Sequence, residues 1–327
     1  MQEDFDFELD RVVKTIRERQ CRTVLLQFPE GMKRRAPGVA MAIASTVDAT
    51  IIISGEPCFG ACDISSNGVD LVVHYGHLPI PCLTTPNSVL YIQARSGADP
   101  LPVLEKALAE ISGRVGLLTT VQHIHNLAGM TEFLRSRGAN VLVGKGDTRI
   151  YTDGQVLGCN ASCARSLGDG ADMFLFVGTG DFHPLAVALS TSKPVIAADP
   201  VACDVRNMAP AREKLLRQRH AAIERARQAS SLGIIISTKQ GQRREKLAAH
   251  ISQILSGAGL LPVLVEMDLV TPGKLDSIGM DAWVSTACPR LAIDDYAAFS
   301  KPILTPPEAE IMVGKRSWDN YVFDEIV

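Results

Sequence analysis

The sequence has no apolar stretch long enough to cross a bilayer, no block of like charges and no low-complexity linker. Its 33 basic and 36 acidic residues leave a formal net charge of -3, so no overall field attracts nucleic acid or anionic lipid. We therefore expect no membrane partner and no direct binding to nucleic acid. Residues 1–6 are acidic and lack the basic and apolar regions of a secretory signal, so we expect a cytoplasmic protein.

The composition also excludes a disordered chain, because 46% of the 327 residues are hydrophobic and only 21% are charged. A chain of this length exceeds the size at which a single hydrophobic core stops growing. Two or three domains are therefore expected.

A disulfide framework is not expected in a long chain without a secretory signal. In a reducing compartment, cysteines gathered in loops more often bind metal or act in redox chemistry. Free cysteine is also among the most buried residue types, so three of the eight are interpreted as small core residues: Cys21, Cys82 and Cys203.

Apolar runs of strand length alternate with segments of helical spacing along the whole chain. The pattern predicts helices over 5–19, 37–47, 100–111, 211–229 and 245–255, and a further helix that starts at 123–125. It predicts strands over 23–28, 50–53, 71–75, 89–92, 115–119, 141–143, 173–177, 195–198, 232–237, 262–265 and 282–286.

This alternation indicates an α/β protein with three similar domains, each a mostly parallel sheet flanked by helices, around a central cleft. We predict domain boundaries at 1–99, 100–210 and 211–327, each of a common domain size. The sequence shows no close residue-level repeat, so the threefold division depends on the pattern of elements alone.

Three loops that follow predicted strands carry cysteines beside glycine or proline, and the carboxyl ends of parallel strands are where ligands bind. The candidate metal ligands are Cys62, Cys159 and Cys288, one in each predicted domain. Soft thiolates select zinc or iron-sulfur clusters, and three ligands would leave one iron of a four-iron cluster open to substrate. Cys58 and Cys163 lie four residues from two of these thiols and remain alternatives to them.

Five segments together closely resemble the diphthamide synthesis family, in particular its archaeal homodimeric enzymes that perform the first step. They are Gly-Glu-Pro-Cys-Phe-Gly-Ala-Cys-Asp at 55–63, Thr-Thr-Val-Gln-His-Ile-His at 119–125, Gly-Gln-Val-Leu-Gly-Cys at 154–159, Ser-Thr-Lys-Gln-Gly-Gln at 237–242 and Ala-Cys-Pro-Arg-Leu-Ala-Ile-Asp at 287–294. The resemblance covers nearly the whole chain.

The resemblance implies a noncanonical radical enzyme in which Cys62, Cys159 and Cys288 hold a 4Fe-4S cluster whose open iron binds S-adenosylmethionine. Such an enzyme is a transferase that moves the 3-amino-3-carboxypropyl group to C2 of a histidine in translation elongation factor 2. The implied partners are elongation factor 2, a second copy of the chain in a homodimer, and a reductant for the cluster.

Further residues are expected to bind S-adenosylmethionine. The turn with Thr238, Lys239, Gly241 and Gln242 offers backbone donors, one cation and a polar amide. Arg290 either pairs with the substrate carboxylate or tunes the cluster through its charge. Gln155 is included as a binding residue, and Asp294 as a weaker candidate for binding or loop support.

Several questions stay open at this level. His123 and His125 are ligands, acid-base groups or helix-start residues, whereas His183, His220 and His250 have the positions of ordinary helix residues. A competing interpretation is a zinc or redox binding α/β protein without radical chemistry. A third is a cofactor-binding α/β enzyme with buried, inert cysteines.

Overall fold

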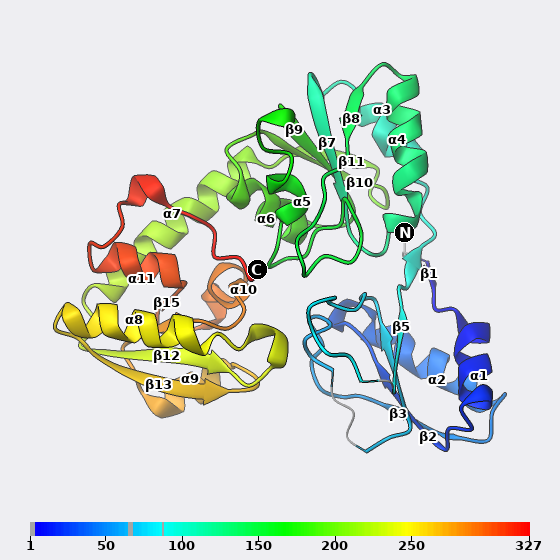
Figure 1. Ribbon diagram of the computed structural model, residues 1–327, viewed down its shortest axis with the longest axis horizontal. Helices are drawn as coiled ribbons and strands as arrows, with labels where there is room; N and C mark the ends of the chain where they lie inside the picture. Colours follow the sequence, from blue (N-terminus) through cyan, green and yellow to red (C-terminus); the bar gives the residue numbers. More distant parts are fainter. Residues whose placement is uncertain (1–3, 65–67, 87) are drawn as a thin grey trace.

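The computed structural model describes residues 4–64, 68–86 and 88–327. Three larger β-sheets, each built from one stretch of the chain, surround a common centre, and a fourth sheet has only two short strands (Figure 1). The predicted α/β architecture is confirmed. None of the described helices is long and apolar enough to cross a membrane.

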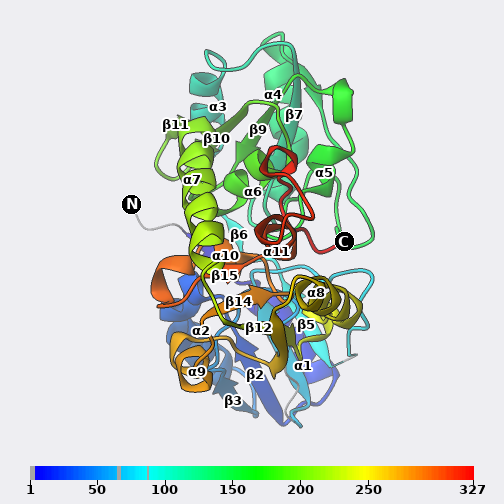
Figure 2. The same ribbon diagram turned by 90° about the vertical axis from the view of Figure 1, so that its left-hand side faces the viewer.

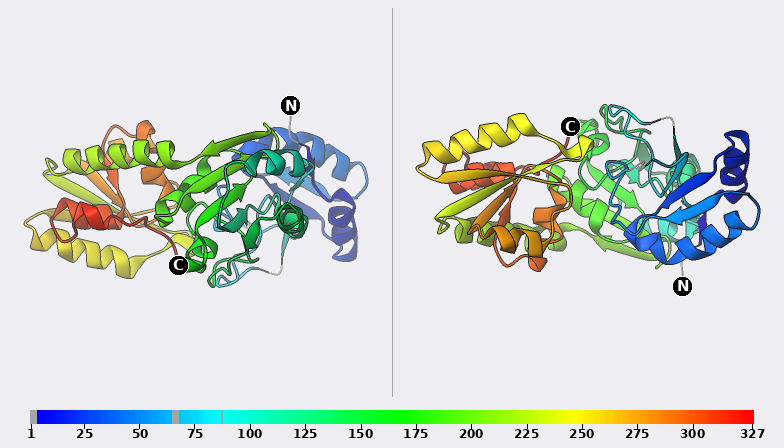
Figure 3. Two further views of the ribbon diagram at one scale, coloured as in Figure 1. Left: turned by 90° about the horizontal axis from the view of Figure 1, so that it is seen from above. Right: turned by 90° about the horizontal axis from the view of Figure 1, so that it is seen from below.

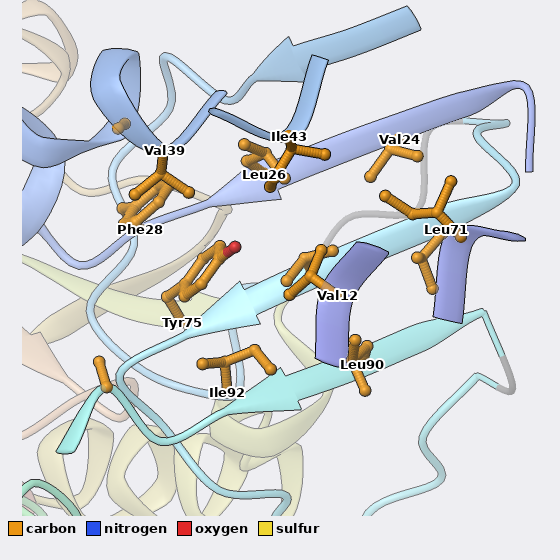
Figure 4. Packing of buried hydrophobic residues seen from close by; sticks show 14 of the residues in the cluster. Val12, Val24, Leu26, Phe28, Val39, Ile43, Leu71, Tyr75, Leu90 and Ile92 are labelled. Carbon is orange, nitrogen blue, oxygen red and sulfur yellow. The ribbon is translucent and has the colours of Figure 1, made fainter. Parts of the chain in front are cut away.

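The first sheet has the order β3-β2-β4-β5, with all neighbours parallel. Phe28 and Tyr75 stack at its centre with ring centroids 4.2 Å apart, and branched aliphatic side chains fill the space around them (Figure 4). This apolar layer lies between the sheet and its helices, as expected for parallel strands buried by crossover helices. The elements are β2 (Thr23–Gln27), β3 (Thr50–Ile53), β4 (Leu71–Tyr75), β5 (Val89–Ile92), α1 (Leu9–Glu18) and α2 (Ala36–Ala44), with β1 (Phe5–Asp6) paired to β6 (Arg95–Ser96).

The second sheet has the order β11-β10-β9-β7-β8, parallel except for the edge strand β11. Its central strand β9 is fully buried, because helices cover both of its faces. The elements are β7 (Arg114–Thr119), β8 (Asn140–Leu142), β9 (Met173–Val177), β10 (Val195–Asp199), β11 (Asp204–Asn207), α3 (Leu101–Ala107), α4 (Leu127–Ser136), α5 (Ser162–Arg165) and α6 (Phe182–Ser190).

The third sheet has the order β13-β12-β14-β15 and is parallel throughout. Gly233 on β12 lets the Trp283 ring lie across the sheet, since a Cβ there would be 2.2 Å from the ring. The elements are β12 (Ser231–Ser237), β13 (Leu261–Met267), β14 (Ala282–Ser285), β15 (Ile303–Leu304), α8 (Glu245–Gly257), α9 (Pro272–Ile278), α10 (Arg290–Ile293) and α11 (Pro306–Met312).

The helix α7 (Ala209–Ala226) runs from the second sheet to the third, as Figures 2 and 3 show. Its Arg219 is fully buried and donates to both carboxylate oxygens of Glu308 at 2.8 and 2.7 Å. The same guanidinium donates to the carbonyls of Ala292 and Ile303, so no charge is left uncompensated in the core. Arg219 therefore ties the connecting helix to the third sheet.

The remaining described helical segments are short 3-10 turns: η1 (Glu30–Arg35), η2 (Ile124–Asn126), η3 (Gly168–Gly170), η4 (Gln240–Gln242), η5 (Tyr296–Ala298) and η6 (Trp318–Asn320).

Three details of the sequence prediction are wrong. Cys82, interpreted as a small core residue, is exposed. The helix expected over 5–19 begins only at Leu9, because Phe5 and Asp6 pair with β6 as a short strand. The strand expected to be buried at 50–53 is an edge strand whose Ile52 and Ile53 are exposed. The sheets occupy separate stretches of the chain, but boundaries at 99 and 210 stay a prediction.

Candidate metal centre

Each of the three candidate ligands lies in a loop attached to a different sheet. Cys62 follows β3, Cys159 lies between β8 and α5, and Cys288 lies between β14 and α10. All eight cysteines are free thiols. The loops leave the carboxyl ends of parallel strands, where an α/β sheet leaves room for a ligand.

The structure brings these three thiols together. Burial raises the pKa of Cys62 to about 12, and the charges of Asp63 and Cys159 add to this effect. Burial also raises the pKa of Cys288, with further contributions from Cys159 and Cys62. Each sulfur is therefore within electrostatic range of another from a different sheet. Their role as metal ligands stays a prediction.

The spacing of the three thiols does not suit a single small ion. A tetrahedral zinc with Zn–S bonds of about 2.3 Å holds its sulfurs about 3.8 Å apart. Within the described part of the chain, the group of three ligand atoms that lie within 4.8 Å of one another is a different one, formed by Cys58, His74 and His77. The three-thiol site is therefore wider than a zinc site.

Positively charged side chains surround the thiol of Cys159. Burial raises the pKa of Cys159, and the guanidinium groups of Arg149, Arg290 and Arg244 oppose that rise. Arg149 and Arg244 were not identified from the sequence, because neither adjoins a cysteine and buried arginines leave no periodic signal. The signal in the sequence that could have identified Arg149 is the glycine-rich loop at residues 144–149, which ends in this arginine.

The Thr238–Gln242 turn lies against Cys62, and its role in binding S-adenosylmethionine stays a prediction. Gln242 donates from Nε2 to the Cys62 sulfur at 2.9 Å. Gly241 is required by close packing, because a Cβ there would be 2.7 Å from Leu83 Cδ1 and 3.0 Å from Cys62 Cβ. The turn from the third sheet therefore supports a thiol loop of the first sheet.

A cavity of about 470 Å³ opens beside Cys62, between the first and third sheets. Thr238, Lys239 and Gly241 line it together with Cys62. The Lys239 ammonium forms a mostly buried ion pair with Asp63 across the two sheets. The one cation expected from this turn is thus already paired within the protein.

Arg290 joins the other two thiol loops. It donates from Nη2 to Asp294 at 2.5 Å, and its guanidinium lies 3.5 Å from the centroid of the Phe182 ring. Phe182 in turn packs on Gly158, where a Cβ would be 2.1 Å from the ring. Burial lowers the pKa of Arg290, and Nη1 is buried without a hydrogen-bond partner among the described residues.

The other predicted residues are placed less centrally. Gln155 is buried beside β7, and no described contact joins its side chain to a thiol, so its binding role stays a prediction. Cys163 is a core residue of the second sheet. His123 is also buried, and His183 lies in α6 as the sequence predicts, within electrostatic range of Arg290.

The donor set fits an iron-sulfur cluster. Three soft thiolates from three sheets, spaced too widely for one ion and faced by arginines, suit a polynuclear anionic core better than a single metal. Gly241 has no side chain, which leaves room beside Cys62 for such a core. Fold and site together define an α/β protein in which three sheets bring three thiols to one site.

The comparisons with known proteins agree with that class. Residues 28–322 match the family model of diphthamide synthesis proteins. The chain is 38% identical over 97% of its length, and 92% of the relative's, to 2-(3-amino-3-carboxypropyl)histidine synthase of Pyrococcus horikoshii. It is 29% identical to the synthase of the same name from Methanocaldococcus jannaschii, over 98% of this chain and 93% of that one.

A solved structure, that of Dph2 from Pyrococcus horikoshii with a 4Fe-4S cluster, superposes with a TM-score of 0.89 at 34% identity. The match covers 100% of this chain and 95% of the other. The chain therefore belongs to the diphthamide synthesis family.

Proposed function

We propose that the chain is a 2-(3-amino-3-carboxypropyl)histidine synthase that uses a 4Fe-4S cluster and S-adenosylmethionine. The observation that carries the proposal is the convergence of Cys62, Cys159 and Cys288 from three sheets, each within electrostatic range of another. Three thiolates leave one of four irons open, and an open iron is a place for substrate. When bound, the cluster supplies one electron to the sulfonium of S-adenosylmethionine.

The net reaction is balanced without an external oxidant. The bond between Cγ and the sulfonium sulfur breaks and gives methylthioadenosine. A new bond joins that carbon to C2 of the target imidazole, and C2 loses its hydrogen as a proton. The electron that starts the cleavage would return to the cluster when the adduct loses this proton. A reductant is therefore needed only to reduce the cluster at the start.

The chain's own residues can orient the aminocarboxypropyl group. Arg149 Nε and Arg290 Nη1 are buried without hydrogen-bond partners among the described residues, and both guanidinium groups act on Cys159. A substrate carboxylate placed between them would satisfy these donors with charge-assisted hydrogen bonds. Lys239 is less suited to this role, because Asp63 already pairs with it.

The competing zinc interpretation has less support. A single zinc would need the three sulfurs about 3.8 Å apart, and they do not form such a group. Buried, inert cysteines are also disfavoured, because an inert thiol at Cys159 would have no reason to lie among three arginines and within electrostatic range of two other thiols.

The proposed protein substrate is translation elongation factor 2, whose target histidine must reach the three-thiol site. We also propose a homodimer. Its support is the edge strand β13, where Leu261, Val263 and Leu264 are exposed on an uncovered sheet edge. Val263→Lys is expected to give monomers in analytical ultracentrifugation. Ile52→Lys on the other exposed edge, β3, is the matched control.

Incubation of the reconstituted, reduced protein with S-adenosylmethionine tests the chemistry. We expect methylthioadenosine, and with elongation factor 2 a modified histidine found by mass spectrometry. Alanine at Cys62, Cys159 or Cys288 should abolish both products and reduce bound iron, while Cys163→Ser keeps them. Formation of 5'-deoxyadenosine, or full activity of the Cys62→Ala variant, would refute the proposal.

A further inference from the structure

A second group of potential metal ligands lies in the first sheet, where its Cys58 shares a loop with Cys62 and lies within electrostatic range of that thiol. Cys58, His74 and His77 place one ligand atom each within 4.8 Å of one another. Cys58 is 1% exposed, and His74 is fully buried. We propose that this Cys-His group binds one divalent transition-metal ion, zinc by the chemistry of its ligands, in addition to the proposed cluster.

The backbone brings the three residues together. His74 is on β4, where it lies opposite Gln27 of β2. Gly76 then turns the chain with φ +75°, and a Cβ there would be 2.6 Å from Pro29 Cγ. The turn returns His77 to His74, so that His77 Nδ1 is 3.0 Å from His74 Nε2. Two imidazole nitrogens on a tetrahedral zinc are about 3.3 Å apart, close to the spacing found.

Hydrogen bonds fix which nitrogen of His74 faces the site. The Gln27 amide donates from Nε2 to the Asp63 carbonyl at 2.7 Å, so its Oε1 must face His74. That oxygen lies 2.9 Å from His74 Nδ1, which therefore carries a proton. The lone pair of His74 is then on Nε2, toward His77 and Cys58. A histidine held by a second partner in this way is the usual arrangement of a metal ligand.

The loop contacts hold the third ligand in place. Lys33 donates to the carbonyls of Gly55 at 3.1 Å and Glu56 at 2.8 Å, just before Cys58. The Cys58 amide points to Glu30 at 3.4 Å. Binding of the ion releases the thiol proton of Cys58 to solvent, and the ring proton of His77 moves from Nδ1 to Nε2, so that both histidines bind as neutral imidazoles.

The fourth position of the ion remains open toward a second cavity. His77 is only partly buried and lines a space of about 640 Å³, together with Thr120, Gln122 and His183. Three protein ligands with an open fourth position are typical of zinc sites that bind a water or a substrate atom. Because Cys58 and Cys62 share one loop, the ion would also stiffen the support of a cluster ligand.

The test uses the anaerobically prepared holoprotein, equilibrated with zinc alone and then dialysed. We expect one zinc per chain with the iron content unchanged, both measured by mass spectrometry of the metals. Cys58→Ser and His77→Ala should each lower zinc affinity more than about tenfold, and Gln27→Leu about 10- to 100-fold. Cys163→Ser, a buried thiol outside both sites, is the matched control and should keep its zinc.

X-ray absorption at the zinc edge gives a second, independent readout. One sulfur at about 2.3 Å and two nitrogens at about 2.0–2.1 Å are expected. The inference is wrong if the holoprotein takes up no zinc, if Cys58→Ser and His77→Ala keep wild-type zinc, or if zinc enters only as iron is lost. Iron content and circular dichroism identify variants that misfold. If a variant misfolds, the X-ray absorption spectrum of the unmutated holoprotein decides whether the ion is bound by this group. Failure of the transfer reaction would not affect this result.

Discussion

Asn160, the residue after Cys159, donates its side-chain amide to the carbonyl of Ile326, 166 positions further along the chain, at 2.9 Å. The Ile326 amide donates to the Cys159 carbonyl at 3.0 Å. Glu325 accepts from the Ala161 amide at 2.5 Å. Residues from the far end of the sequence therefore form one wall of the Cys159 loop.

The link from that wall to the third sheet is the basis of a first prediction. Arg244 donates to both carboxylate oxygens of Asp324, at 2.8 and 2.7 Å, from a largely buried position. Asp324→Ala removes the carboxylate that pairs with this guanidinium and leaves it bonded to the carbonyls of Thr286 and Ala287, which should cost about 3–5 kcal/mol of stability. We expect loss of most of the bound iron, measured per chain after reconstitution. Val322→Ala, at an exposed position nearby, should retain iron.

A second prediction concerns the hydrogen bond from Gln242 to the Cys62 sulfur. A donor to a ligand sulfur favours the more negative, reduced state, so Gln242→Leu should lower the reduction potential of the cluster by about 50 mV. A titration followed by electron paramagnetic resonance measures it. Gln240→Leu, on the exposed side of the same turn, serves as control. Equal potentials in all three proteins would contradict the prediction.

Gly241→Ala should disturb the site by steric overlap. The new Cβ would be 3.0 Å from Cys62 Cβ and 2.7 Å from Leu83 Cδ1, so the cysteine loop must move. Overpacking of this kind costs about 1–3 kcal/mol, which corresponds to roughly 5- to 150-fold weaker cluster retention. Gly257→Ala meets nothing within 4 Å and should bind iron normally. Dilution in the presence of an iron chelator compares the two variants.

The stability of the apoprotein should depend on pH through His123. Burial lowers its pKa to about 4, with a smaller contribution from His125. Between that value and about 6.5 the unfolded chain binds the extra proton, so stability rises with pH and is lost as pH falls through this window. His123→Gln should reduce the loss between pH 7 and pH 5 by up to about 2 kcal/mol. Urea melts at both pH values test this, with the exposed His250→Gln as control.

Arg219→Met should destabilise the third sheet strongly. The substitution leaves Glu308 charged and fully buried without its partner, at a cost of about 3–5 kcal/mol. Thermal unfolding of the apoprotein measures the change. Arg217→Met removes only an exposed ion pair with Glu213, 3.9 Å long, and should shift stability by no more than about 0.5 kcal/mol. Similar melting temperatures for both variants would show that the buried pair is dispensable.

The sequence predicted the sheets well because their strands are short, uniformly apolar runs with few alternative structures. The strands at 50–53, 71–75, 89–92 and 173–177 have the predicted bounds. The first helix was predicted too long, because the apolar spacing of Phe5 and Phe7 is equally compatible with a strand that pairs with Arg95 and Ser96. Such pairing over a long chain separation leaves no local signal.

The cysteine loops were identified because glycine, proline and thiols mark a loop directly. The arginines around Cys159 were not, because their burial depends on how three separate sheets pack. The wall provided by Ile326 was likewise invisible, since main-chain carbonyls and amides carry no residue-type signature. His74 and His77 escaped notice because the hydrogen bonds that orient them involve Gln27 on a neighbouring strand.

The three-thiol site takes one sulfur from each sheet, and each sheet is a separate stretch of the chain. An inorganic core bound there would act as a cross-link that closes two long loops of polypeptide, much as a disulfide does. Oxidative destruction of that core would then remove the cross-link between the three sheets and abolish the reaction. Oxidative damage to the core would therefore loosen the packing of the three sheets against one another, which exposes backbone to proteases.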